Sequence, residues 1–259
     1  MEAVLDSGVI GRGLVAQSLR RLVNHHPQAI FFASGTGDST CRDQMIFSRE
    51  RELLEAAIGD CRRAGLRLVY CSSAGAVYGC FPGMRDEETE CLPVTPYGIH
   101  KLGCEALVRT SDVHHLILRI SNLVGPSANA CQLLPSLVRQ ILSGVVRVDR
   151  EACRDLIRIG EFCEVLDELL ENAGDQETVI MAAGISTTVQ SLVWEIETIL
   201  HLKARMLPGS AGVPHHFDVA KLRRLAPRTA QFDKDYPLAI LQHHIPIIVA
   251  ELNQSRRAA

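Results

Sequence analysis

Tyr97 and Lys101 stand four positions apart in a segment that directly follows Pro96. If a helix begins at Pro96, the two side chains lie on one helical face, where the ammonium can act on the phenol. A free phenol has a pKa of about 10, so a neighbouring cation is the simplest means of making it a proton carrier at neutral pH. The pair therefore predicts proton transfer to or from a substrate.

A pair of serines offers the hydroxyl that this chemistry needs. Leu66 to Cys71 is apolar and predicts a buried strand, which leads into Ser72-Ser73. A hydroxyl at the end of this strand can hold a substrate carbonyl against Tyr97 while a hydride reaches the carbon. We interpret Ser73, Tyr97 and Lys101 as the catalytic residues of a carbonyl reductase, with Ser72 as the alternative hydroxyl. A surface helix with an unrelated lysine is the simpler alternative for the Tyr-x-x-x-Lys spacing alone.

A glycine-rich turn near the N-terminus predicts a second functional segment. Ala3-Val4-Leu5 indicates a short buried strand, and Gly8 to Gly13 a turn that opens a helix. Such a turn can receive a dinucleotide pyrophosphate, because glycines allow close backbone approach and a helix N-terminus offers unpaired N–H groups. An ordinary strand-to-helix connection is the alternative. Ala29 to Ala33 is the next strand, and residues 41–64 form a long helical pattern whose charged residues we assign to a solvated face.

The motifs around Tyr97 resemble those of a known family. Ser72-Ser73, Val77-Tyr78-Gly79 and Tyr97-Gly98-Ile99-His100-Lys101 together resemble the extended short-chain dehydrogenase/reductase family, of NAD-dependent epimerase/dehydratase type, over Val4 to about Val189. The resemblance implies an α/β fold, a Rossmann-like doubly wound parallel sheet with a small C-terminal substrate-binding part.

The sheet is expected to be shortened in its first half. Only about twenty residues separate Gly11 from Ala29, which is room for one crossover helix. The strand from Ala29 looks like the fourth strand of the family, so the second and third strands are missing. We expect a dinucleotide-binding part at 1–125 and a substrate-binding part at 126–259, interleaved with the last strands.

The resemblance also implies a nicotinamide cofactor. Gly8 and Gly11 match the last two glycines of the family's Gly-x-x-Gly-x-x-Gly, and Leu5 stands at the first. The missing segment would carry the acidic residue that holds the adenosine ribose. Arg12 is placed to meet a 2′-phosphate, so NADPH (NADP) is favoured over NAD. The expected cofactor-binding residues are Gly8, Ile10, Gly11, Arg12, Ala33, Ser34, Gly35, Tyr97 and Lys101.

A nucleotide sugar is the substrate that the resemblance implies. Asn122 lies in a turn that resembles the family's Asn-x-x-Gly-Pro, and Arg154 in a segment that resembles its Arg-Asp-Phe-x-His-Val, whose arginine reaches the diphosphate. With Ser73 these are the expected substrate-binding residues. Ala74-Gly75 replaces the Asp-Glu pair of the 4,6-dehydratases, so dehydration is not expected.

Of the reactions that the family catalyses, reduction or epimerisation at a sugar ketone therefore remains as the expectation. The short chain and the shortened dinucleotide-binding part most resemble the small nucleotide-hexose 4-ketoreductases of deoxysugar and antibiotic-sugar biosynthesis. A nucleotide-sugar 4-epimerase, and a non-catalytic relative that binds a cofactor or a partner, are the alternatives.

Composition and charge limit the classes of partner that this chain is expected to bind. A net charge of -3 without long charged runs argues against nucleic acid, and no apolar stretch reaches the roughly 20 residues of a membrane span. A strand so near Met1 leaves no room for a signal peptide, so a cytoplasmic protein is expected. The nine cysteines form no Cys-x-x-Cys pair, and no metal site is expected. The resemblance is compatible with a homodimer through the Tyr97 helix.

Overall fold

The computed structural model describes residues 8–81, 83–127, 129, 131–149, 151–209 and 214–257. The expected strand Ala3-Val4-Leu5 lies outside these residues. Within the described chain, no helix combines the length and the apolar character that crossing a membrane requires.

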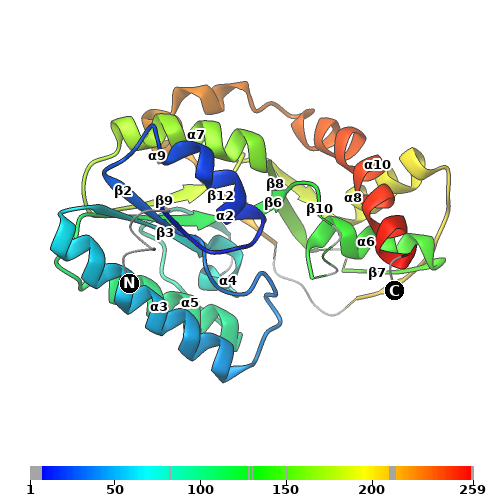
Figure 1. Ribbon diagram of the computed structural model, residues 1–259. Helices are drawn as coiled ribbons and strands as arrows, with labels where there is room; N and C mark the ends of the chain where they lie inside the picture. The colour runs from blue at the N-terminus through cyan, green and yellow to red at the C-terminus, as the bar shows by residue number, and fades with distance from the viewer. Residues whose placement is uncertain are drawn as a thin grey trace.

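A five-stranded parallel sheet forms the larger part of the molecule (Figure 1). Its strands, in their order across the sheet, are β1 (Val9–Ile10), β2 (Ala29–Phe32), β3 (Arg67–Ser73), β5 (His115–Ile120) and β9 (Glu177–Met181). Strands β2, β3 and β5 are buried along nearly their whole length, as expected for a parallel sheet covered on both faces.

Helices cover both faces of this sheet (Figure 1). Helices α2 (Leu14–Leu19) and α7 (Ile159–Asn172) pack on one face, and α3 (Gln44–Ala64) and α5 (Pro96–Arg109) on the other. Alternate residues of β2 point to the two layers: Phe31 packs with the α2 side and Phe32 with the α3 side. The Rossmann-like α/β fold with a parallel sheet is therefore confirmed.

The crossovers of the sheet do not share one hand. The strand order advances in a single direction from β1 to β5, so crossovers of one hand would place their helices on one face. Helix α2 lies opposite α3 and α5, so the β1–α2–β2 connection has the opposite hand to the next two. Parallel crossovers are right-handed in about 98% of cases. In a doubly wound sheet the first crossover runs to a strand on the other side of β1, so all crossovers can be right-handed. No described strand lies on that side of β1.

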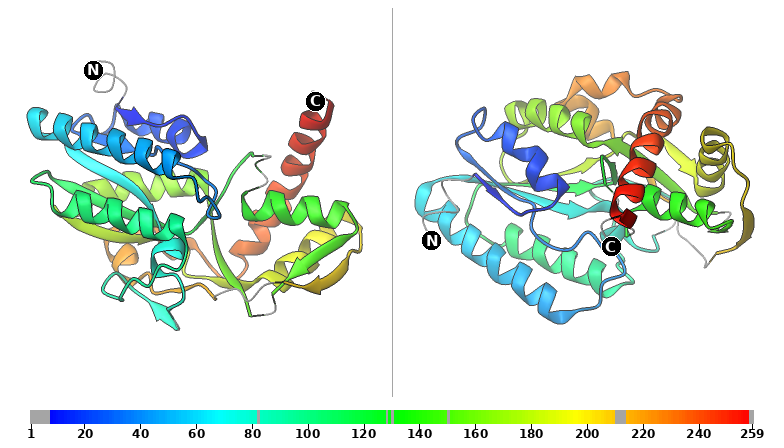
Figure 2. Two further views of the ribbon diagram at one scale, coloured as in Figure 1. Left: turned by 90° about the horizontal axis from the view of Figure 1, so that it is seen from below. Right: turned by 45° about the vertical axis from the view of Figure 1, so that its right-hand side comes forward.

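The second part of the molecule lies beside the carboxyl end of the sheet (Figure 2). Its helices are α6 (Leu133–Leu142), α8 (Val189–Leu200) and α10 (Tyr236–Arg257). Its strands are β6 (Asn122–Val124), β7 (Val145–Val148), β8 (Cys153–Arg158), β10 (Ser186–Thr188) and β11 (Arg205–Pro208). Helix α7 and strand β9 come later in the chain than β6, yet belong to the larger part, so the chain passes between the two parts more than once.

Short elements complete the fold. They are the 3-10 helices η1 (Arg20–Leu22) and η2 (Pro227–Gln231), the helices α4 (Ala74–Tyr78) and α9 (Ala220–Leu225), and the paired strands β4 (Met84–Arg85) and β12 (His216–Phe217).

The glycine turn is shorter than the sequence indicates. Val9 and Ile10 pair with Phe31 and Phe32 as strand β1, so the turn proper is Gly11-Arg12-Gly13. Expecting a turn throughout was wrong for Val9 and Ile10, because β-branched residues fit a buried strand better than a turn. Gly11 has φ +143°, and a Cβ there would lie 2.3 Å from the Ala33 carbonyl oxygen.

Gly11→Ala should lower the free energy of unfolding by about 1–3 kcal/mol, since the alanine is strained at this φ and meets backbone. Gly13→Ala is the matched control, because a Cβ at this exposed position meets nothing within 4 Å among the described residues, and its φ of -75° suits any residue. We expect a loss under about 1 kcal/mol for Gly13→Ala. Urea unfolding of both variants measures the difference, and equal losses would contradict the packing described for this turn.

Candidate active site

Helix α5 begins where the sequence predicts and sets the two reactive side chains. Pro96 occupies its first turn, and the Thr95 hydroxyl caps it by accepting a hydrogen bond from the Gly98 N–H at 3.0 Å. The Tyr97 and Lys101 side chains face β3, and both residues are buried. The Lys101 Nζ lies 6.0 Å from the centre of the Tyr97 ring.

The two serines at the end of β3 have different partners. The Ser72 hydroxyl donates a 2.5 Å hydrogen bond to the buried Glu105 carboxylate, so it serves the interior of the protein. The Ser73 hydroxyl faces Tyr97 instead and lowers the pKa of the phenol by hydrogen bonding. Of the two, Ser73 is therefore the hydroxyl placed beside the phenol.

A buried network behind Ser72 holds this end of the sheet in place. Arg119 on β5 lies 2.9 Å from Glu105 on α5 and donates a 2.8 Å hydrogen bond to the Tyr78 hydroxyl on α4. Glu105 also pairs with Arg109 at 2.7 Å. These bonds tie α4, α5 and β5 together around β3, so Glu105 has a structural role.

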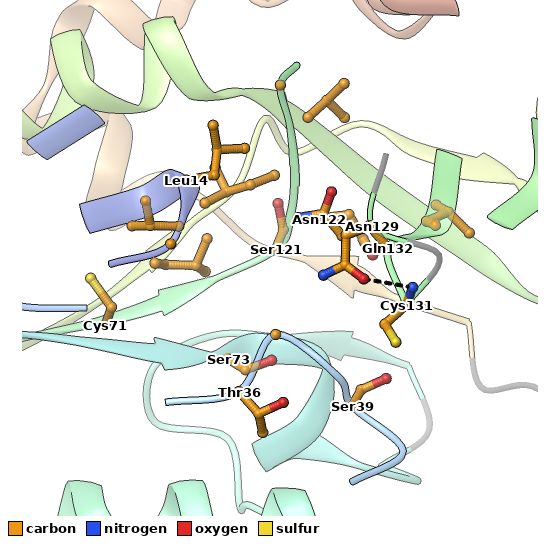
Figure 3. Close-up of a pocket in the computed structure, with 18 of the residues that line it drawn as sticks. Leu14, Thr36, Ser39, Cys71, Ser73, Ser121, Asn122, Asn129, Cys131 and Gln132 are labelled. Atoms are coloured by element: carbon orange, nitrogen blue, oxygen red, sulfur yellow. Dashed lines mark hydrogen bonds between the residues drawn. The ribbon is translucent and has the colours of Figure 1, made fainter. Parts of the chain in front are cut away.

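A cavity of about 360 Å³ lies at the carboxyl ends of the strands. Figure 3 shows Ser73 on one side of it and, on the other, Ser121 and Asn122, with Asn129 and Gln132 beside Asn122. Seven of the expected site residues line this cavity: Ala33, Ser34, Gly35, Ser73, Tyr97, Lys101 and Asn122. The fold thus brings together residues that are up to 89 positions apart, from Ala33 to Asn122 (122 − 33).

Four expected cofactor residues do not line the cavity as described. Gly8 directly precedes β1, and a Cβ there would meet Val23 at 2.5 Å. Ile10 belongs to β1 and packs into the core beneath α3. Gly11 closes against Ala33, and Arg12 is exposed. The cavity is lined instead by Gly13, Leu14 and Val15, just beyond the predicted residues.

A second cavity of about 510 Å³ adjoins the first. Ser73, Ser121 and Asn122 line both, so the two spaces meet at Ser73. Arg154 lines only the second cavity, together with His215. The Asn122 side chain is held there by donating to the Asp155 carbonyl oxygen at 3.1 Å.

His215 is a site residue that the sequence did not reveal. Its ring covers Gly75, where a Cβ would lie 2.4 Å from the imidazole. Burial, with the positive charges of Arg154 and Arg85, lowers the pKa of His215 to about 3, so the ring is neutral and can donate or accept a hydrogen bond. In the sequence it appears only as one half of a His-His pair, which carries no signal for this position.

Lys101 is held by three protein acceptors. Its Nζ lies 2.8 Å from the Glu50 carboxylate, 3.2 Å from the Cys71 carbonyl oxygen and 3.4 Å from the Tyr70 hydroxyl. Burial alone would lower the pKa of Lys101, but the acidic groups of Tyr97 and Glu50 outweigh it and hold the pKa above its ordinary value. The ammonium is therefore charged.

Assigning every charge of α3 to a solvated face was wrong for Glu50. Its side chain is only 1% exposed, because it lies on the buried stripe that also carries Phe47 and Leu54. The spacing of these three residues by three and four positions was the available signal. By contrast Met45, an apolar residue of the same helix, is 82% exposed.

The acidity of Tyr97 also differs from the simple expectation. Burial raises the pKa of the phenol, Lys101 lowers it, and Glu50 raises it again. The net result is a pKa above the ordinary value of the side chain, because burial outweighs the ammonium, whose effect Glu50 also partly cancels. In the protein alone, Tyr97 is thus a protonated phenol suited to donating a proton.

Glu50, His100 and Cys104 bring three potential metal-ligand atoms within 4.8 Å of one another. Glu50 already pairs with Lys101 at 2.8 Å and with His100 at 3.1 Å. A cation added here would face the charge of Lys101, so we interpret the group as an ion-pair cluster, and the expectation of no metal site stays a prediction.

The first cavity gathers five of the residues expected to bind one half of a nicotinamide dinucleotide. Ala33, Ser34 and Gly35 expose backbone beside Tyr97 and Lys101, and Gly35 has φ +120°, which favours glycine. The other half has less support, because β1 is the edge strand of the described sheet and no described strand stands beyond it to receive an adenosine.

Residues 8–183 match the family described as NAD dependent epimerase/dehydratase family. The match covers more than half of the 259 residues, and the chain belongs to this family. The family resemblance of the Tyr97 motifs is thereby confirmed.

Two curated relatives share parts of the sequence. The chain is 35% identical over 85 residues to a UDP-glucose 4-epimerase of Azospirillum brasilense, which covers 30% of this chain and 24% of the relative. It is 28% identical over 149 residues to a dTDP-4-dehydro-6-deoxyglucose reductase of Escherichia coli, which covers 53% of this chain and 47% of the relative. The matches thus span about a quarter and about half the length of these relatives.

Solved structures share the fold at low sequence identity. A UDP-N-acetylglucosamine 4-epimerase from Methanobrevibacter ruminantium M1 in complex with UDP-N-acetylmuramic acid has a TM-score of 0.74 at 21% identity, over 86% of this chain and 77% of that chain. RMD from Pseudomonas aeruginosa, complexed with NADPH, has a TM-score of 0.69 at 19% identity, over 88% and 82%. A UDP-glucuronic acid 4-epimerase from Bacillus cereus, in complex with NAD, has a TM-score of 0.73 at 18% identity, over 89% and 77%.

Ser72→Ala should lower the free energy of unfolding by about 1–3 kcal/mol, because the buried Glu105 carboxylate loses a hydrogen-bond donor. Ser73→Ala should stay within about 0.5 kcal/mol of the wild type, since its hydroxyl faces the cavity. Chemical denaturation of the two variants tests this contrast, and a larger loss for Ser73→Ala would contradict the roles given to the two hydroxyls.

Proposed function

We propose that this chain catalyses the NAD(P)H-dependent reduction of the 4-keto group of a nucleotide-activated 6-deoxyhexose. The observation that carries the proposal is the position of Ser73, which lines both cavities and interacts with Tyr97 in the first. A ketone at this junction would lie between a hydroxyl that holds its oxygen and a phenol that protonates it. The coenzyme, when bound, supplies the hydride.

Each residue of the site has a separate role in the proposed reaction. Ser73 donates a hydrogen bond to the ketone oxygen, and Tyr97 delivers the proton to the same atom. Lys101 stabilises the phenolate that remains, since it stays charged and lies near the ring. Asn122 and the cavity walls orient the sugar between them.

The second cavity is proposed to take the nucleotide diphosphate. Arg154 has a planar guanidinium that can bind two phosphate oxygens at once, and it lies in the cavity that meets the first at Ser73. His215, neutral in the same cavity, can accept a hydroxyl hydrogen bond from the sugar.

NADPH is proposed as the preferred coenzyme. Arg12 is exposed in the turn after β1, where its guanidinium can reach a 2′-phosphate. One neighbouring structure holds NADPH and another holds NAD, so the coenzyme of this chain rests on Arg12.

A nucleotide-sugar 4-epimerase is the second candidate, favoured by the match to the UDP-glucose 4-epimerase of Azospirillum brasilense. An epimerase oxidises and re-reduces one carbon and therefore keeps its coenzyme bound between the two steps. Strand β1 lies at the edge of the sheet formed by the described residues, which argues for a looser grip on the adenosine half and suits a reductase that exchanges its coenzyme every cycle.

A non-catalytic relative is the third candidate, since all three donors of Lys101 are engaged by protein groups.

One assay separates the three candidate functions. Purified protein is supplied with NADPH or NADH and dTDP-4-dehydro-6-deoxyglucose, and then with UDP-glucose alone. Consumption of reduced coenzyme supports the reductase, conversion of UDP-glucose without added coenzyme supports the epimerase, and coenzyme binding without turnover supports the non-catalytic relative.

Tyr97→Phe should reduce turnover at least about a hundredfold, because the ring still packs but the proton donor is gone. The melting temperature should change little, since the phenol oxygen faces the cavity. Steady-state kinetics with the ketosugar measure the effect, and a variant that keeps a tenth of the wild-type rate would refute the role of Tyr97.

Arg154→Ala should raise the KM for the nucleotide sugar at least about tenfold, because one charge-assisted hydrogen bond is worth about 1.5–3 kcal/mol. The KM for NADPH should stay unchanged. Arg224→Ala, at an exposed position outside both cavities, is the control. An unchanged KM for the sugar in Arg154→Ala would mean that the diphosphate binds elsewhere.

A further inference from the structure

Glu50 is a buried carboxylate that lies between two cationic side chains. Its Oε1 is 2.8 Å from the Nζ of Lys101, and its Oε2 is 3.1 Å from the Nε2 of His100. The carboxylate also touches the floor of the first cavity, since a Cβ on Gly35 would lie 2.3 Å from Oε2. Helix α3, which carries no proposed catalytic residue, thereby reaches the site.

His100 connects this carboxylate to the outer face of the protein. It lines a third cavity, of about 410 Å³, between α3 and α5, and its side chain is 10% exposed. Phe47 stacks on the ring with a centroid distance of 4.5 Å and keeps it facing Glu50. Burial opposes a charge on His100, but the Cys104 thiol and the Glu50 carboxylate outweigh it and raise its pKa to about 9. At neutral pH the cluster thus holds two cations and one anion.

We propose that Glu50 and His100 are positioning residues that set the acidity of Tyr97 through Lys101. Glu50 holds the Lys101 ammonium beside the phenol but also cancels part of its field. His100 in turn neutralises part of Glu50, so its charge restores the field of Lys101 at Tyr97. This inference rests on the proposed role of Tyr97 as the proton donor.

Other titratable or charged groups surround the cluster on each packed element. Asp38, in the loop after β2, acts on Tyr97 from across the cavity, and Arg51 lines the outer cavity with His100. The remaining groups are Tyr70 and Cys71 on β3 and Cys104 on α5. The charged groups paired with Glu50 itself are Lys101, at 2.8 Å, and His100, at 3.1 Å.

The first experiment needs no activity. The titration of His100 is followed by NMR in the cofactor-free protein and in Glu50→Gln, and its signal is identified among the ten histidines by its absence in His100→Asn. We expect a pKa near 9 in the wild type and a value at least one unit lower in Glu50→Gln, where burial and Lys101 act without the carboxylate. The same pKa in both proteins would overturn the inference.

The second experiment measures the pH dependence of kcat/KM, whose alkaline limb reports the loss of the Tyr97 proton. Glu50→Gln should move this limb to lower pH, and His100→Asn should move it to higher pH. A purely structural role would change the melting temperature and leave both limbs in place. The control is Glu52→Gln, the same change at an exposed position of α3.

The outcomes separate this inference from the proposed function. If no ketosugar is reduced by the wild type, the proposed function fails, while the NMR titration still tests the cluster. If turnover occurs but the two limbs do not move in opposite directions, the inference fails. If Glu50→Gln does not fold, the shift of the limb in His100→Asn decides alone.

Discussion

The ammonium of Lys101 is the constraint on which the site depends. It is 4% exposed, and a buried charge without partners costs several kcal/mol or more, so the fold must surround it with acceptors. Two elements meet that requirement with three acceptors: α3 brings Glu50, and β3 brings the Tyr70 hydroxyl and the Cys71 carbonyl oxygen. The packing of α3 and α5 against β3 is therefore fixed by electrostatics as well as by apolar contacts, and Tyr97 takes its place from the same packing.

A second buried ion pair lies on the other side of the reactive serine. Glu105 and Arg119 join α5 to β5, and the Ser72 hydroxyl joins both to β3. Ser73 therefore lies at the end of a strand that is held at two points. The Glu105–Arg119 pair holds it through Ser72, and Glu50 holds it through Lys101, which also binds the Cys71 carbonyl oxygen. Side chains mounted on such elements keep their geometry without help from a ligand.

The sequence predicted the parts of the site that depend on local spacing. Tyr97 and Lys101 share a helix, and Ser73 ends a strand, so periodicity was enough to place them. Glu50 and His215 were missed because their roles come from contacts between distant segments: Glu50 meets Lys101 across 51 positions, and His215 covers Gly75 from the far part of the chain. The fold class followed from strands and motifs, whereas the exact start of β1 did not, since valine and isoleucine beside glycines fit either a turn or a strand.

The unusual hand of the first crossover has a consequence for how the molecule holds together. In the described part of the chain, strand β1 is two residues long and lies at the edge of the sheet, paired with β2. The segment of β1, the Gly11-Arg12-Gly13 turn and α2 is therefore attached to the rest of the fold by this short pairing and by the packing of Ala16 and Leu19 in the core. A ligand that bridges Leu14 and Gly35 in the first cavity joins this unit to the rest of the sheet. A ligand bound at that position stabilises the attachment of this segment, because it binds only when the two sides of the cavity are in place.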